Sequence, residues 1–153
     1  MYLIDTNVIS EIRKKGKADS GVRAFFKSAT KQDNPLFISV ITVGELRRGV
    51  EMIRHRGDNL QASKLEKWLQ TIVEQYAENI LDFTEPEAQV WGLLRAPGRG
   101  APGRGVPRYE NALDKQIAAT ALTYDLTLVT RNVEDFVGTG IELLNPWKSG
   151  TDA

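Results

Sequence analysis

The chain has 153 residues, 41% of them hydrophobic, and its 20 basic side chains balance 20 acidic ones, which indicates one folded domain rather than a disordered chain. It contains no cysteine and a single histidine, so disulfides, zinc ribbons, thiol catalysis and two-histidine metal sites are excluded. No apolar run approaches the ~18 residues of a membrane span and the N-terminus lacks the basic start of a secretory signal, so we expect a cytoplasmic protein with no membrane partner.

Short apolar runs alternate with longer amphipathic segments along the chain. The runs, most of them with β-branched residues, predict buried strands at Tyr2–Asp5, Leu36–Ile41, Ile80–Phe83, Leu126–Thr130 and Ile141–Leu144. The segments between them predict helices at Val8–Lys14, Val22–Ala29, Val43–Arg56, Leu60–Ala77, Glu85–Arg95 and Ala112–Tyr124. This alternation predicts an α/β fold with a mainly parallel sheet of about five strands and right-handed crossovers, but it does not predict the strand order.

One segment breaks this pattern. The five residues APGRG occur twice in tandem from Ala96 to Gly105, and Pro107 follows closely. Proline and glycine at this density exclude a helix or a central strand. We therefore predict a flexible basic loop over residues 96–107, between the last two helices.

Four acidic residues are candidates for a functional site. Asp5 ends the first predicted strand, Glu45 follows the second, and Asp135 follows the fourth. Because ligand crevices in parallel sheets lie beyond the carboxyl ends of the strands, these three acids would gather at one edge. Asp114 lies three residues before Ile117, which begins the apolar stripe of its helix, so its side chain points toward the packed side.

Two of these acids also fit a purely structural role. Asp5 is a good helix N-cap. Thr42 and Glu45 have the T-x-x-E spacing of a capping box, and Thr84 and Glu87 share that spacing at a place where we expect no chemistry. Taken singly, each acid favours the capping interpretation.

The other two acids also have structural alternatives, because Asp114 would pair with a buried arginine and Asp135 would begin a helical turn with Asn132. Capping does not account for a cluster of all four acids, because each pair of carboxylates about 4 Å apart repels by roughly 4 kcal/mol at an effective dielectric of 20. Such a cluster needs bound cations or protonation. Oxygen ligands without histidine or thiolate suit Mg²⁺ or Mn²⁺, which activates water for attack at phosphorus.

Basic side chains gather in three segments, Arg13–Lys17, Arg47–Arg56 and Arg95–Arg108. Each is compatible with a solvated surface, but around an acidic, metal-loaded centre they would hold a phosphate backbone. The candidates for such contacts with a phosphate backbone are Arg47, Arg48, Arg104 and Arg131.

Five motifs together carry a family resemblance: DTNVISEI, TVGELRRG, ALDKQIAATAL, LVTRNVEDF and NPW. With them the chain resembles the PIN-domain ribonucleases, and more closely the VapC-type toxins of the FitB-like group, from Met1 to about Trp147. The resemblance implies a single PIN-like three-layer domain over residues 1–147, followed by a tail at residues 148–153. The APGRG duplication departs from the family, which joins these helices by a shorter segment.

The resemblance also implies a site and partners. Asp5, Glu45, Asp114 and Asp135 correspond to the family's catalytic and metal-binding acids, while Thr6 and Asn132 correspond to supporting positions. The implied cofactor is Mg²⁺ or Mn²⁺, and the implied substrate is RNA, although transfer, ribosomal and messenger RNA all stay open. The implied partners are a second copy in a homodimer, a cognate antitoxin, and operator DNA bound through the antitoxin complex.

Two other interpretations stay open at this point. One is a catalytically silent PIN-like module that acts by binding an antitoxin and operator DNA, although all four acids are intact. A metal phosphatase or a receiver-like domain also places acids at strand ends. A receiver, however, needs a lysine after a late strand, where this chain has Arg131.

Overall fold

The computed structural model describes residues 1–96 and 112–147. The predicted loop beyond Ala96, which includes Arg104, and the predicted tail at residues 148–153 lie outside the described residues. Within the two described ranges, no helix combines the length and the apolar character needed to cross a membrane.

A parallel sheet forms the centre of the fold. Its strands are β1 (Tyr2–Ile4), β2 (Leu36–Ser39), β3 (Ile80–Leu81), β4 (Thr127–Val129) and β5 (Leu143–Leu144). They are arranged in the order β3-β2-β1-β4-β5, and every pairing is parallel. In this register Tyr2 lies opposite Leu36 on one side and Thr127 on the other. The predicted α/β fold with a five-stranded parallel sheet is confirmed.

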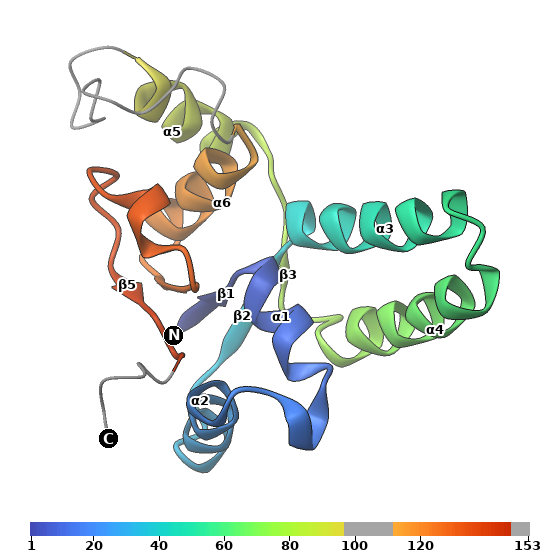
Figure 1. Cartoon of the computed structure of the whole chain (residues 1–153). Helices are drawn as coiled ribbons and strands as arrows, with labels where there is room; N and C mark the ends of the chain where they lie inside the picture. The colour runs from blue at the N-terminus through green and yellow to red at the C-terminus, as the bar shows by residue number, and fades with distance from the viewer. Residues whose placement is uncertain (97–111, 148–153) are drawn as a thin grey trace.

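Helices connect the strands as predicted. They are α1 (Thr6–Ile12), α2 (Ser20–Lys31), α3 (Val40–His55), α4 (Asn59–Gln75), α5 (Glu85–Arg95) and α6 (Ala112–Thr123), with two short 3₁₀ turns, η1 (Lys15–Lys17) and η2 (Val133–Phe136). Figure 1 shows α3 and α4 side by side as a pair that extends away from the sheet.

Helices α1 and α3 begin earlier than predicted, because in each case the residue at the strand end is itself the helix cap. Helix α1 begins at Thr6 and α3 at Val40, two and three residues before the predicted starts. The Asp5 carboxylate accepts a hydrogen bond from the Thr6 N–H at 2.8 Å, and the Ser39 hydroxyl accepts one from the Ile41 N–H at 3.0 Å. The chain therefore passes from strand to helix without an intervening loop.

The sheet has a hydrophobic core on each face. Ile4, Ile38 and Val129 face the core formed with α1 to α4, whereas Leu3 and Leu128 face the core formed with α5 and α6. Alternate residues of a strand point to opposite faces, so strands buried on both faces are apolar throughout. The predicted three-layer arrangement is confirmed, and Figure 1 shows α5 and α6 on the opposite side of the sheet from α3 and α4.

The strand order fixes where a ligand can approach. From β1 the chain builds β2 and β3 on one side, then returns to add β4 and β5 on the other side. The strand order thus reverses between β1 and β4, and such a switch point opens a crevice beyond the carboxyl ends of the strands. Asp5 follows β1 at this point, and Thr130 follows β4.

The two T-x-x-E motifs differ in the structure. Glu87 forms the capping box of α5, and its buried carboxylate accepts hydrogen bonds of 2.8 Å from both the N–H and the hydroxyl of Thr84. Burial raises the pKa of Glu87, but the hydrogen bonds from Thr84 and Tyr124 lower it by a larger amount in total. The pKa of Glu87 therefore lies below its usual value. Since Tyr124 comes just after α6, Glu87 links α5 to α6.

We predict that Glu87→Gln lowers the stability of the protein at neutral pH by about 1 kcal/mol, or roughly 2–4 °C in Tm. A carboxyl group whose pKa is lowered by folding stabilises the fold above its unfolded pKa, and this contribution is lost as the pH falls through the folded value. The Tm difference between Glu87→Gln and wild type should therefore shrink toward pH 3. The exposed Glu85, in the same first turn, provides the control Glu85→Gln, which should leave Tm unchanged. An equal loss in both variants at pH 7 would contradict this role of Glu87.

Candidate active site

Asp5 is the buried acid at the switch point, with only 5% of its surface exposed. One carboxylate oxygen caps α1 through the N–H of Thr6, and the other accepts a hydrogen bond of 2.8 Å from the hydroxyl of Thr130. The capping interpretation of Asp5 is therefore correct. It does not compete with a chemical role, because the second oxygen points across the crevice toward the end of β4.

Thr130 holds this second oxygen in place. Its hydroxyl oxygen accepts hydrogen bonds from the side-chain amide of Asn7 at 3.3 Å and from the Asn132 N–H at 3.1 Å. Since both neighbours donate, the single hydroxyl hydrogen of Thr130 is directed to Asp5. The Asn7 carbonyl oxygen in turn accepts a hydrogen bond from the Arg131 N–H at 3.2 Å.

The sequence analysis missed Thr130 and Asn7 as site residues. Both residues belong to motifs that the sequence analysis used: Asn7 is the last residue of D-T-N, and Thr130 is the first residue of T-R-N. Neither motif, however, shows that Asn7 contacts Thr130, which lies 123 positions away.

Glu45 lies inside α3, and it is not part of a capping box, because Ser39 caps that helix. Its half-buried carboxylate accepts a hydrogen bond from the Thr6 hydroxyl at 3.0 Å. Thr6 thus donates its N–H to Asp5 and its hydroxyl to Glu45. One residue at the start of α1 bridges the two carboxylates.

The two carboxylates are held in an environment that disfavours their charge. Burial raises the pKa of Asp5, hydrogen bonds from Thr130 and Thr6 lower it, the charge of Asp135 raises it again, and the net shift is upward. Burial also raises the pKa of Glu45, with a further increase from the charge of Asp5. Within the described residues, neither Asp5 nor Glu45 forms an ion pair with a lysine or arginine.

The other two acids lie on neighbouring elements. Asp135 is exposed in η2 and interacts with Asp5 through its charge. Asp114 is half-buried in the first turn of α6, which packs against α3, the helix of Glu45. As positioned in residues 1–96 and 112–147, no three acidic or histidine side chains form a group that could hold a metal ion. The structure thus connects Asp5 with Glu45 and with Asp135, and places Asp114 on an adjacent helix.

The predicted phosphate-binding arginines have different surroundings. Arg47 forms an ion pair with Glu66 of α4 at 2.6 Å and one with Glu51 of its own helix at 3.4 Å. Arg48 makes no ion pair with a described residue, and its charge lowers the pKa of Glu45. The guanidinium of Arg131 lies over the ring of Trp147, 5.1 Å from its centre.

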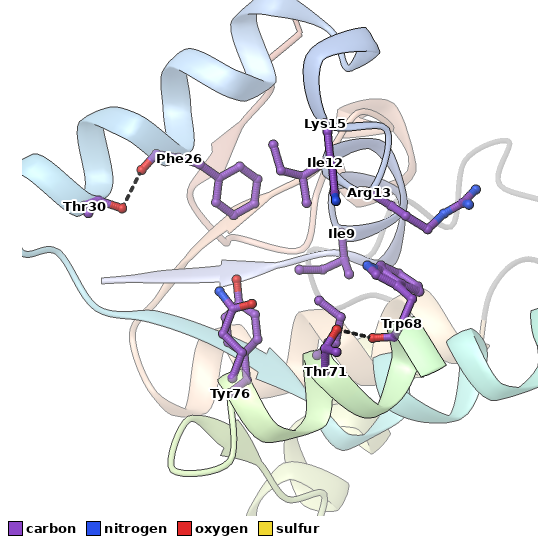
Figure 2. A pocket seen from close by; sticks show the side chains of 11 residues that line it. Ile9, Ile12, Arg13, Lys15, Phe26, Thr30, Trp68, Thr71 and Tyr76 are labelled. Carbon is purple, nitrogen blue, oxygen red and sulfur yellow. Dashed lines mark hydrogen bonds between the residues drawn. The ribbon is translucent and has the colours of Figure 1, made fainter. Parts of the chain in front are cut away.

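A cavity of about 340 Å³ lies between α1, α2 and α4, and Figure 2 shows its side chains. Ile9, Phe26 and Tyr76 form apolar walls, and Arg13 lies beside the ring of Trp68. None of the four candidate acids lines this cavity. It is therefore separate from the carboxylates at the switch point.

The chemistry of Asp5 and Glu45 fits a hard divalent cation. Their donor atoms are carboxylate oxygens, which Mg²⁺ and Mn²⁺ prefer. Both pKa values are raised, and a bound cation would relieve the repulsion that contributes to them. Hydrogen bonds from Thr6 and Thr130 fix the two carboxylates in advance of any ligand.

Comparison with known proteins gives one consistent family. The PIN domain model matches residues 2–138. Toxin FitB of Neisseria gonorrhoeae is 34% identical over 148 residues, which cover 96% of this chain and 99% of the toxin. VapC ribonuclease Y4jK of Sinorhizobium fredii is 29% identical over 149 residues, 97% of this chain and 99% of the ribonuclease. A solved structure of FitAB bound to an IR36 DNA fragment has a TM-score of 0.75 at 31% identity, with both chains fully covered.

We predict that metal-free Asp5→Asn melts no lower than the wild type at neutral pH. Asparagine keeps the N-cap of α1 and removes a buried charge. It loses the hydrogen bond from Thr130, but the net upward shift of the pKa of Asp5 indicates that burial costs the charged carboxylate more than its hydrogen bonds return. Because folding raises the pKa of Asp5, the wild type loses stability as the pH rises from the unfolded value through the folded one, and the variant does not. Thermal unfolding in EDTA between pH 4 and pH 8 measures this difference. A variant that melts several degrees lower at pH 7.5 would show that the charge of Asp5 stabilises the metal-free fold.

Proposed function

Because the chain belongs to the PIN-domain family, we propose that it is a divalent-metal-dependent endoribonuclease and the toxin of a toxin–antitoxin pair. The observation that carries the proposal is the pair of carboxylates, Asp5 and Glu45, bridged by Thr6 at the switch point of the sheet. Two carboxylates with raised pKa values and no ion pair to a described lysine or arginine are a costly arrangement unless a cation binds there.

In this proposal Asp5 and Glu45 hold Mg²⁺ or Mn²⁺, and Asp114 and Asp135 complete the site from α6 and η2. When bound, a divalent cation there stabilises negative charge on phosphoryl oxygens and activates water. Thr130 and Thr6 keep the carboxylates of Asp5 and Glu45 in fixed positions, and Asn132 supports Thr130 through its N–H. This rigidity lowers the cost of reorganisation during phosphodiester cleavage.

The substrate and partners follow from the relatives. A homologue is named a VapC ribonuclease, which supports RNA as the substrate. The proposal also includes the cytoplasm as the place of action. The solved FitAB structure contains a DNA fragment, which supports an antitoxin partner and operator DNA for this chain. A homodimer remains part of the proposal.

We predict that the antitoxin-free protein cuts RNA at discrete positions with Mn²⁺ or Mg²⁺, and that EDTA abolishes the cuts. Asp5→Asn and Glu45→Gln should each lower the rate by about 1000-fold or more, because each removes a metal ligand. Gel or sequencing analysis of total cellular RNA gives both the rate and the cut sites. Glu85→Gln, on the surface of α5, is the matched control and should cut at the wild-type rate.

Metal binding has a separate readout. A divalent ion at 100 times its dissociation constant should stabilise the wild type by about 2.7 kcal/mol and Asp5→Asn much less. If Asp5→Asn and Glu45→Gln both cleave RNA at the wild-type rate, these acids do not form the site. If the wild type shows no cleavage and no metal-dependent shift in Tm, the catalytically silent binding module is favoured.

The two adjacent arginines provide a matched pair for RNA binding. Arg48→Gln should weaken binding and reduce the slope of log affinity against log salt by about 0.7–1, since one phosphate contact is lost. Arg47→Gln should leave the slope unchanged, because Glu66 and Glu51 already neutralise Arg47. Binding of single-stranded RNA in EDTA, titrated with KCl, measures both slopes. Equal slopes for the two variants would remove Arg48 from the RNA-binding surface.

A further inference from the structure

A second cavity opens at Glu45, one of the two bridged carboxylates. It has a volume of about 160 Å³, and Thr6 and Glu45 form part of its wall. From there it extends between α3 and α4 to Arg13 and Trp68, which separate it from the larger cavity of Figure 2. A group bound in this slot, as we call the cavity, would therefore lie next to the position at which the carboxylates act.

The walls of the slot are mainly apolar, and its polar lining residues are Thr6, Ser10, Arg13 and Glu45. Val50 and Leu65 belong to the core and line its sides. The guanidinium of Arg13 lies 5.7 Å from the centre of the Trp68 ring and adds a positive charge at the far end. Pockets for drug-sized ligands start at about 300 Å³, so this slot suits one small, mostly apolar group with polar edges.

We propose that the slot binds one unpaired nucleobase of the RNA, adjacent to the phosphate that is cut; this inference rests on the proposed endoribonuclease function. A nucleobase has an apolar face and polar edges, and it is attached covalently to the backbone that the carboxylates engage. Proteins that read RNA sequence do so on unpaired bases, which pack against aromatic rings and arginine planes. Trp68 and Arg13 supply both. A paired base cannot enter the slot, so the cut lies in single-stranded RNA.

Gly49 allows the slot to be filled without disturbing the fold. It lines the slot in the middle of α3, and a Cβ added there meets no atom within 4 Å. Residue 49 lies four positions after Glu45 and therefore on the same helix face, so its side chain would lie in the slot. Leucine is a better helix former than glycine, and Gly49→Leu should melt at or above the wild-type Tm.

The experiment compares RNA oligonucleotides that carry a base or an abasic residue next to the cut, at the position where wild-type cleavage of a random-sequence pool shows a base preference. Removal of the base should lower kcat/KM of the wild type by about 10- to 100-fold, the usual effect of losing one stacked base. Gly49→Leu should show the same loss on the base-containing RNA and no further loss on the abasic RNA. Trp68→Leu, at the far end of the slot and away from Glu45, should show the same coupling.

Gly92→Leu is the matched control. Gly92 also lies within a helix, α5, where an added Cβ meets no atom within 4 Å, and it does not line the slot. This variant should keep the full wild-type preference for the base. If Gly49→Leu and Trp68→Leu respond to base removal exactly as the wild type does, the inference is overturned, and a protein partner becomes the better occupant.

A binding measurement separates this inference from the proposed function. The Asp5→Asn protein should bind the base-containing RNA more tightly than the abasic RNA, and adding Gly49→Leu should remove the difference. Such coupling in binding without any cleavage by the wild type would overturn the nuclease proposal and support the slot. Cleavage by the wild type without any coupling would support the nuclease and overturn the slot.

Discussion

The burial of a charged carboxylate at the end of the central strand is the constraint around which this fold is arranged. Asp5 follows β1, which has a strand on either side, and little solvent reaches its side chain. Its oxygens therefore need donors from the protein, and they receive them from the start of α1 and from Thr130 after β4. The helix start, the strand order and the candidate site all meet at this one side chain.

The fold was predictable because its layers leave a direct pattern in the sequence. The strands are buried on both faces and read as short apolar runs, and the helices between them are amphipathic. The strand order was not predictable, since the runs do not encode which neighbour each strand selects. The acids were predictable as candidates, because Asp5 follows a strand end and Asp114 precedes the apolar stripe of its helix.

Contacts that join distant parts of the chain could not be predicted. The hydrogen bond from Thr130 to Asp5 spans 125 positions, and the one from Thr6 to Glu45 spans 39. Identical T-x-x-E spacing gave a capping box at Glu87 and a candidate site residue at Glu45, and only the strand–helix junction at Ser39 decides between them. The difference between Arg47 and Arg48 likewise depends on Glu66 of the next helix, which local sequence does not reveal.

The short strands at the sheet borders have a consequence for association. The two edge strands, β3 and β5, contain two residues each, so the borders offer few unpaired backbone groups to another chain. A template of this length is too short to recruit a foreign strand, and the sheet is protected against edge-to-edge aggregation. Within the described residues, recognition of another chain therefore falls to side chains outside the sheet, where substitutions can change a partner without altering the sheet.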